Sequence, residues 1–268
     1  MREKNKGCSV LFADIFCGDG MNVIDGQEIN GSPISMLEGL VGALLSMKGA
    51  PSSKYRCLFA DISEGRATDF LPQRVRTWAD SKGLELSDDC TKLLIPLKGK
   101  DGNILKEKAE VLLTFAQASA VETVNWISSV LRRRDKRRRA CIFVDPNGPK
   151  HAPWEELRNL WDQHKRKVEI TAHISATQLK RIKGAREVGK AMPQVPDHVS
   201  AMIGAFKGAG GWIRSPAGAD QWTVAMLTMF QPRSDWKKAG FVAIDSEEGA
   251  DTIRRLSLTA KEYNKCTK

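Results

Sequence analysis

The sequence lacks the features that mark membrane-spanning, secreted and zinc-binding proteins. None of its apolar runs approaches the ~18 residues that a membrane-spanning helix requires. Residues 1–7 are charged and lead into an apolar run without a small-residue cleavage site. The six cysteines include no C-x-x-C pair, and the four histidines show no ligand spacing with them or with each other. These absences predict a cytoplasmic protein with reduced thiols, no membrane association and no metal site.

The sequence does contain enough apolar residues for one folded domain, together with an excess of positive charge. The 268 residues are 41% hydrophobic and include 7 Trp and 9 Phe, which predicts a single domain spanning residues 1–268 with a substantial core. Lysine and arginine number 42 against 32 aspartates and glutamates, for a net charge of +10. This surplus favours a polyanionic partner, nucleic acid first, and leaves a protein partner or a homodimer open.

The chain is organised around a short apolar stretch close to its start. Residues 10–16 predict a buried strand that stops at Gly18 and Gly20, with Asp14 interrupting it. Val23 replaces the third glycine of a dinucleotide fingerprint, and the Gly-Lys-Ser/Thr of a phosphate-binding loop is absent. An acid followed by G-x-G at the end of a first strand is the arrangement that holds the methionine part of S-adenosylmethionine. A glycine turn beside a buried charge is the alternative.

Periodicity predicts an α/β fold with helices between the first five strands. The predicted strands are residues 10–16, 55–61, 92–97, 140–145, 168–175, 222–230 and 240–245. The predicted helices are residues 34–45, 67–82, 105–118, 121–131, 154–161 and 250–258. This order indicates a doubly wound, mostly parallel seven-stranded sheet that ends in an antiparallel hairpin.

Carboxylates at later turns extend the predicted cofactor site. Asp61 ends the second strand, where an acid can accept hydrogen bonds from ribose hydroxyls, although it can equally cap the helix that follows. Asp101, in a polar turn at residues 98–103, can approach an adenine ring. Ser32 is predicted to cap the first helix ahead of Pro33. The candidate cofactor-binding residues are therefore Asp14, Phe16, Gly18, Gly20, Ser32, Asp61, Ile62 and Asp101.

The fourth predicted strand ends in Asp145 and Pro146, followed by Asn147. In amino-methylating enzymes, a polar side chain and a carbonyl held by a rigid proline turn accept hydrogen bonds from an exocyclic NH₂ and aim its lone pair at the cofactor methyl. We therefore predict Asp145, Pro146 and Asn147 as catalytic residues, with an ordinary Asp-Pro turn as the alternative. His173 lies within the fifth strand, and we interpret it as a core or supporting residue.

Two basic segments and one tryptophan are candidates for substrate contact. Residues 178–186 follow the carboxyl end of the fifth strand, on the side of the sheet where ligands bind, with a solvated helix face as the alternative. The denser run at residues 132–139 is either a phosphate-contacting patch or a solvated connection. A glycine-rich segment around Trp212 forms either a lid that stacks on a base or a hairpin turn. The candidate substrate-binding residues are Lys180, Arg181, Lys183, Arg186 and Trp212.

Two blocks of the sequence resemble a known family. Residues 12–20, followed by the Asp-Gly at 25–26 and the Gly-Ser-Pro at 31–33, resemble the opening block of the three-Cys-motif partner proteins. Residues 144–148 resemble their later D-P-F-G block, with Asn147 where an aromatic residue is expected. The resemblance covers roughly the first 60 and the middle 40 residues.

This resemblance implies a Rossmann-like (class I) S-adenosylmethionine-dependent methyltransferase. The implied positions are Asp14, Gly18 and Gly20 at the methionine end, Asp61 at the ribose, and Asp145 and Pro146 at the acceptor. The leading hypothesis is a methyltransferase that modifies an amino nitrogen of a base in nucleic acid, with DNA favoured over RNA. The alternative, which the departure at Asn147 favours, is a non-catalytic or differently acting nucleic-acid-binding or partner module on a degenerate methyltransferase scaffold.

Overall fold

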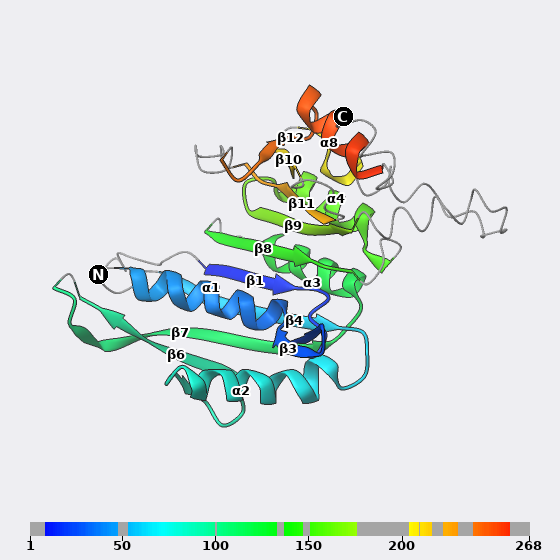
Figure 1. Cartoon of the computed structure of the whole chain (residues 1–268). Helices are drawn as coiled ribbons and strands as arrows, with labels where there is room; N and C mark the ends of the chain where they lie inside the picture. Colours follow the sequence, from blue (N-terminus) through cyan, green and yellow to red (C-terminus); the bar gives the residue numbers. More distant parts are fainter. Residues whose placement is uncertain are drawn as a thin grey trace. The chain divides into compact units, whose positions relative to one another are not determined.

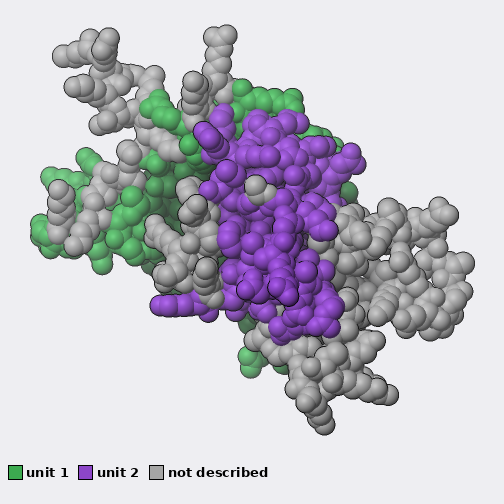
Figure 2. Space-filling model, turned by 90° about the horizontal axis from the view of Figure 1, so that it is seen from above, with its two compact units in different colours: residues 1–142 green, residues 143–268 purple. Residues whose placement is uncertain are grey.

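The chain folds as a mixed α/β protein whose contacts fall into two compact units, residues 1–142 and residues 143–268 (Figure 2). The computed structural model describes residues 9–47, 53–99, 101–132, 137–146, 151–175, 204–208, 210–215, 222–229 and 238–257. The single domain expected from composition stays a prediction. Among the described residues, every helix is too short or too polar to cross a membrane.

Unit 1 is built on a sheet that is parallel at its centre and antiparallel toward one edge (Figure 1). Its strands lie side by side in the order β8 (Arg138–Val144, of which residues 138–142 belong to this unit), β1 (Ser9–Asp14), β4 (Lys54–Asp61), β7 (Ile104–Gln117), β6 (Lys92–Lys98) and β5 (Glu85–Leu86). β4 runs parallel to both β1 and β7, whereas β6 is antiparallel to β7 and to β5.

Helices pack on both faces of this sheet (Figure 1). α1 (Ser32–Ser46) and α2 (Leu71–Ser81), which follows a π-helical turn at Arg66–Phe70, cover one face, and α3 (Ala120–Arg132) packs against β4 on the other. The core beneath α1 and α2 takes every second residue of the strands, such as Leu93 and Ile95 of β6 and Val111 of β7. Because strand side chains alternate between faces, the residues between these positions point to the opposite side.

A small hairpin, β2 (Met21–Ile24) and β3 (Gln27–Asn30), leads from β1 to α1. Its two-residue turn, Asp25-Gly26, has φ of 51° and 78°, which is the left-handed pair that tight hairpins require. The sequence predicted only a polar loop here. Helix α1 then begins at Ser32, and its N-cap residue is Gly31 without a side-chain cap hydrogen bond, so the predicted capping role of Ser32 is wrong.

Among its described residues, unit 2 contains four antiparallel strands and two helices. The strands lie in the order β12 (Phe241–Ala243), β10 (Gly211–Arg214), β11 (Trp222–Leu227) and β9 (Val168–Ser175). Each neighbouring pair is antiparallel. The helices are α4 (Trp154–His164) and α8 (Glu247–Ser257).

The described residues contain ten strands besides the hairpin β2–β3, so the predicted count of seven is wrong. Most predicted elements are confirmed, but two further predictions about strands are wrong. Residues 104–117 form the long strand β7, not a helix, because Ala109, Val111 and Leu113 are buried in strict alternation. Lysine and glutamate between them favour a helix locally, and the pairing of β7 with both β4 and β6 overrides that preference. The second error is the terminal hairpin, because β10 lies between β11 and β12, which the sequence paired directly.

Candidate functional site

The loop after β1 folds back against the end of β4. Asp14 ends β1 and is fully buried, and its Oδ1 accepts a hydrogen bond from the Phe16 N–H at 3.1 Å. The Cys17 N–H donates to the carbonyl oxygen of Ala60 at 3.1 Å. These two contacts fix the first turn of the loop directly above the parallel pair β1 and β4.

Asp61 ties the glycine loop to the turn that follows β4. Its Oδ2 accepts a hydrogen bond from the Gly18 N–H at 3.1 Å, and its Oδ1 accepts one from the Ser63 N–H at 2.7 Å. The bond to Ser63 is a local turn contact, because the next helical turn begins only at Arg66. A carboxylate offers about four acceptor sites, so Asp61 retains capacity for a ligand hydroxyl.

The two glycines of this loop are required for different reasons. Both have positive φ, 57° at Gly18 and 81° at Gly20. A Cβ on Gly18 would meet no atom within 4 Å, so backbone is open to a ligand there. A Cβ on Gly20 would lie 2.5 Å from Leu71 Cδ1, and the Gly20 carbonyl accepts the Gly31 N–H at 2.9 Å. Gly20 therefore packs the loop onto the starts of α1 and α2.

The thiol of Cys17 is buried among carboxylates of the loop and of β4. Burial raises the pKa of this thiol well above its usual range, and the charges of Asp14, Asp61 and, more weakly, Asp19 raise it further. The thiol therefore stays protonated at neutral pH. Arg74 forms an ion pair with Asp19 at 3.3 Å. Three carboxylates therefore lie around one buried thiol, and because Arg74 offsets only the charge of Asp19, this environment favours a cationic ligand.

Two other predicted cofactor residues lie beside this loop. Ile62 directly follows Asp61 and is 70% exposed, so its side chain offers an apolar surface on which the flat face of a base can rest. Ser32 is half-buried at the first position of α1, next to Gly31. The structure therefore brings together seven of the eight predicted residues: Asp14, Phe16, Gly18, Gly20, Ser32, Asp61 and Ile62.

Asp101, the eighth, lies at the opposite end of the sheet. It sits in the turn between β6 and β7, where hydrogen bonds from the Asn103 side chain and backbone lower the pKa of its carboxyl. Because Asp61 pairs with Gln117 at the other end of the 14-residue β7, Asp101 is about 45 Å from that position along the strand. Asp101 therefore does not share a site with Asp61.

The residues that take the place of Asp101 are those at the carboxyl end of β7. Gln117 is opposite Asp61, the Ala118 N–H donates to the Asp61 carbonyl at 3.1 Å, and Ser119 follows. The sequence did not reveal these residues, because the periodicity of residues 105–118 predicts a helix there. The alternation of Ala109, Val111 and Leu113 was the signal that identifies the strand and hence its end.

In unit 2, Asp145 forms a pair with His173. The Asp145 Oδ1 and His173 Nδ1 atoms are 2.8 Å apart, and both side chains are partly exposed, at 43% and 32%. Pro146 is buried, so the backbone after Asp145 is held rigidly. His173 comes from β9, and its role as a support for Asp145 agrees with the sequence interpretation. Asn147 lies outside the described residues.

The remaining substrate candidates are placed only in part. Lys180, Arg181, Lys183 and Arg186 lie outside the described residues. Trp212 is half-buried in strand β10, opposite Met226 and Ala243, so its predicted place in a loop or lid is wrong. In the arginine run, residues 133–136 are not described, and Arg138 donates to the Val130 carbonyl at 3.0 Å, which joins α3 to β8.

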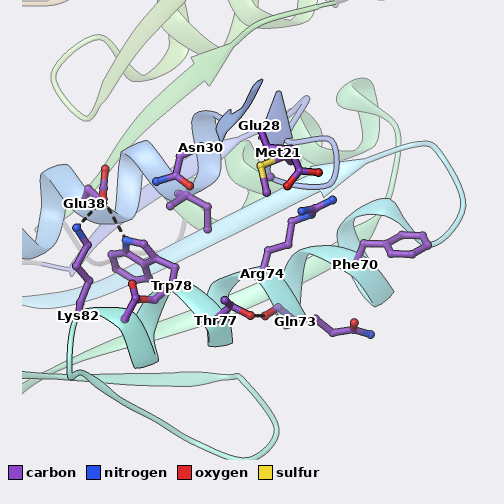
Figure 3. A pocket seen from close by; sticks show the side chains of 13 residues that line it. Met21, Glu28, Asn30, Glu38, Phe70, Gln73, Arg74, Thr77, Trp78 and Lys82 are labelled. Carbon is purple, nitrogen blue, oxygen red and sulfur yellow. Dashed lines mark hydrogen bonds and ion pairs between the residues drawn. The ribbon is translucent and has the colours of Figure 1, made fainter. Parts of the chain in front are cut away.

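A separate hollow of about 580 Å³ lies on the α1 and α2 side of the same loop (Figure 3). The hairpin β2–β3, α1 and α2 form its walls, and Gly20 borders it. Glu38 accepts from Trp78 Nε1 at 3.3 Å and pairs with Lys82 at 3.1 Å across it. Asp14 and Asp61 do not line this hollow, so it is distinct from the carboxylate cluster.

No protein-family model matches this sequence, and no curated protein matches it either. Among solved structures, the chain is similar to protein LPL1258 of Legionella pneumophila, with a TM-score of 0.45 and 9% identity over 88% of this chain and 81% of that chain. Human methyltransferase-like protein 13 in complex with SAH gives a TM-score of 0.37 and 10% identity over 97% and 86% of the two chains. The putative methyltransferase yhhF of Escherichia coli gives 0.30 and 11% over 83% and 78%. At these values the likeness is one of general architecture, and the resemblance to the three-Cys-motif partner proteins stays a prediction.

Proposed function

We propose that the chain is an S-adenosylmethionine-dependent methyltransferase whose cofactor binds at the loop between β1 and the hairpin. The observation that carries this proposal is the hydrogen bond from the Gly18 N–H to Asp61 Oδ2. It holds an open, left-handed glycine at the carboxyl end of two adjacent parallel strands, which is where doubly wound sheets bind nucleotides. It also keeps the carboxylates of Asp14 and Asp61 near one point.

The residues at this loop fit the cofactor in charge and in shape. S-adenosylmethionine has a positive sulfonium and an amino group, and the three carboxylates around Cys17 favour cations. Asp61 has acceptor capacity for the ribose hydroxyls. The exposed side chain of Ile62 and the polar groups of Gln117 and Ser119 suit an adenine ring, which has one apolar face and hydrogen-bonding edges.

Asp145, Pro146 and His173 form the proposed acceptor group in unit 2. The cofactor supplies an electrophilic methyl group on a positively charged sulfur. Asp145 would accept a hydrogen bond from the amino group of a base and so orient the nitrogen lone pair for methyl transfer. The nitrogen then loses a proton to water. His173 Nδ1 contacts Oδ1 of Asp145 at 2.8 Å, so Oδ2 would be the oxygen that accepts from the amino group.

Nucleic acid is the proposed substrate, with DNA favoured over RNA. The net charge of +10 favours a polyanion, and an exocyclic amino group on a base is the nucleophile that an Asp-Pro acceptor group suits. Mass spectrometry of nucleosides from cells that produce the protein tests this. We expect a methylated amino-nucleoside that is absent when Asp145→Ala is produced and still present with Glu155→Ala, an exposed carboxylate on α4.

Calorimetry with S-adenosylmethionine tests the cofactor step by itself. The purified protein should bind it with a dissociation constant in the micromolar range, as enzymes usually bind their substrates. A titration without heat of binding, confirmed by the absence of a thermal shift, would refute the enzyme proposal at its first step.

One observation favours a second function. Both oxygens of Asp61 already accept backbone hydrogen bonds, from Gly18 and Ser63, which reduces what the carboxylate can offer a ribose. The second function is a nucleic-acid-binding or partner module on a degenerate methyltransferase scaffold. Salt-dependent nucleic-acid binding without any cofactor affinity would identify this function.

A further inference from the structure

The outer face of the sheet in unit 1, at β6, β7 and the start of β4, is rich in lysine and arginine. Val111 of β7 and Ile95 of β6 belong to the core beneath α1 and α2. Successive residues of a strand point to opposite faces, and directly opposed residues of neighbouring strands share a face. The residues that alternate with the core positions are opposed to one another: Arg56 to Leu112, Leu112 to Lys92, and Pro96 to Lys108. These residues therefore point away from α1 and α2.

Six cations lie on this outer face, and together they are called the basic sheet face here. All are exposed: Lys54, Arg56, Lys92, Lys98, Lys106 and Lys108. Two acids, Glu110 and Glu85, share the face. Lys92 pairs with Glu110 at 3.4 Å and Lys108 pairs with Glu85. Among the described residues no ion pair is recorded for the other four cations, so the face keeps a clear positive excess.

The basic sheet face is also hollowed. β7 continues past the start of β4, and the notch between them is a cavity of about 530 Å³. Lys54, Arg56, Lys108 and Glu110 line it from the basic sheet face, and Glu107 and Ala109, which alternate with them along β7, line it from the α1 and α2 side. The half-buried side chains of Leu94, Pro96 and Leu112 form an apolar strip between the cations. A polyanion with flat apolar groups therefore finds both charge and contact area here.

We propose that the basic sheet face docks the phosphate backbone of the nucleic acid that the protein acts on. Charge complementarity favours a polyanion, and the apolar strip between the cations favours single-stranded nucleic acid, whose bases can stack against it. The proposal relies on the proposed function only for the identity of the polyanion. In this proposal the cations, which lie between positions 54 and 108 of the chain, position the nucleic acid through its phosphates and do not read its base sequence.

The position of this face makes it a docking surface and not a part of the reacting site. Lys108 is nine residues before Gln117 on β7, so about 30 Å separates the notch from the strand end where Asp61 lies. A bound strand is thus held at a distance from the glycine loop of unit 1. Loss of these contacts should weaken binding without changing affinity for S-adenosylmethionine.

Fluorescence anisotropy of the full chain with a labelled single strand of about 30 nucleotides tests this proposal. The variant is Lys54→Gln, Arg56→Gln and Lys106→Gln together, which leaves both ion pairs of the face intact. Loss of three phosphate contacts should lower the slope of log K against log salt by about two, and the affinity by about tenfold or more at low salt. The matched control is Arg66→Gln, Arg166→Gln and Lys238→Gln, three exposed cations elsewhere with the same change in net charge.

The outcomes separate this proposal from the proposed function. The proposal for the basic sheet face would be overturned by an equal loss of affinity in both triple variants, by an unchanged slope of log K against log salt, or by no binding of the strand to the unaltered protein. Face-dependent binding to vesicles of phosphatidylserine and phosphatidylcholine, without binding to the strand, would overturn it in favour of a lipid surface. Calorimetry with S-adenosylmethionine on the same samples judges the enzyme proposal independently, since face-dependent nucleic-acid binding can hold when cofactor binding fails.

Discussion

Strand β4 begins among cations and ends among carboxylates. Lys54 and Arg56 at its start belong to the basic sheet face, whereas Asp61 at its end joins Asp14 and Asp19 around Cys17. The eight residues of the strand separate these two ends by roughly 25 Å. One strand therefore supports two environments of opposite charge in the same unit.

Opposite charge at the two ends of β4 allows one unit to bind two ligands of opposite charge. The carboxyl ends of β1 and β4 lie together because the strands are parallel, so loop residues from both supply the carboxylates. The amino end of β4 is basic because β7 extends beyond the start of β4 and exposes the outer face of β7 there. A cationic cofactor is attracted to the first end and repelled by the second, and a polyanion shows the opposite preference. The two ligands are therefore expected to bind without competing.

The largest expected effect comes from filling the glycine loop at the acidic end. Gly20→Ala places a Cβ 2.5 Å from Leu71 Cδ1 at a φ of 81°, which costs about 1–3 kcal/mol of stability and displaces the loop. Urea unfolding should show this loss, and calorimetry should show cofactor affinity lowered by more than tenfold. Gly39→Ala is the control, because nothing lies near its Cβ within α1, and it should stabilise the protein by about 0.5–1 kcal/mol. Normal cofactor binding by Gly20→Ala would place the cofactor elsewhere.

The second prediction tests whether the two ends act independently. Asp61→Asn removes a charge that accepts the Gly18 N–H, and charge-assisted hydrogen bonds contribute about 1.5–3 kcal/mol, so cofactor affinity should fall about tenfold to a hundredfold. Nucleic-acid affinity should remain unchanged, as it should in Asp80→Asn, an exposed carboxylate on α2. If Asp61→Asn bound the labelled strand much more tightly than Asp80→Asn did, the acidic end would contact the polyanion as well, and the two ends would not act independently.

The sequence was sufficient for the acidic end because strand ends leave a local signal. Asp14, Gly18 and Asp61 stand where apolar runs stop, and parallel pairing brings such positions together. It was insufficient for the position of Asp101, because the amphipathic pattern of residues 104–117 satisfies a helix and a half-covered strand in the same short window. The alternation of Ala109, Val111 and Leu113 favours the strand, and the pairing of β7 with β4 and β6 stabilises it.

The basic sheet face was beyond sequence analysis for a different reason. Its six cations are spread over residues 54–108, at Lys54, Arg56, Lys92, Lys98, Lys106 and Lys108, while the run at residues 132–139 is far denser. These cations lie together because of the register in which β4, β7 and β6 pair, and not because they are close in the sequence. The pair of Asp145 and His173 was likewise hidden, since the hydrogen bond joins residues 28 positions apart.

A third prediction uses residues that belong to neither end. If His173 positions Asp145 through an N–H on Nδ1, His173→Asn should keep most methyl transfer, because its amide nitrogen occupies a similar place. His173→Leu should lower kcat by about tenfold, the worth of one hydrogen bond to a charge, with KM for the cofactor unchanged. Equal loss in both variants would show that the imidazole ring itself takes part in the reaction. A nitrogen NMR spectrum of His173, compared with that of Asp145→Ala, reports the tautomer without reference to activity.

The smallest effect concerns the buried thiols between the two ends. Burial raises the pKa of Cys57, midway along β4, to about 12 from 9.0, and the pKa of Cys17 rises for the same reason and because of nearby carboxylates. Above pH 9 the unfolded chain releases these thiol protons while the folded chain retains them. The contribution of each thiol to the free energy of unfolding is therefore complete below pH 9 and is lost as the pH rises toward the folded-state pKa. The loss is about 1.4 kcal/mol per pH unit for each thiol. Urea unfolding between pH 8 and 10 should show this decline, and Cys57→Ala should lessen its slope by one thiol's share. An unchanged slope would mean that water reaches the middle of β4, and the acidic and basic ends would then no longer be separated by a dry core.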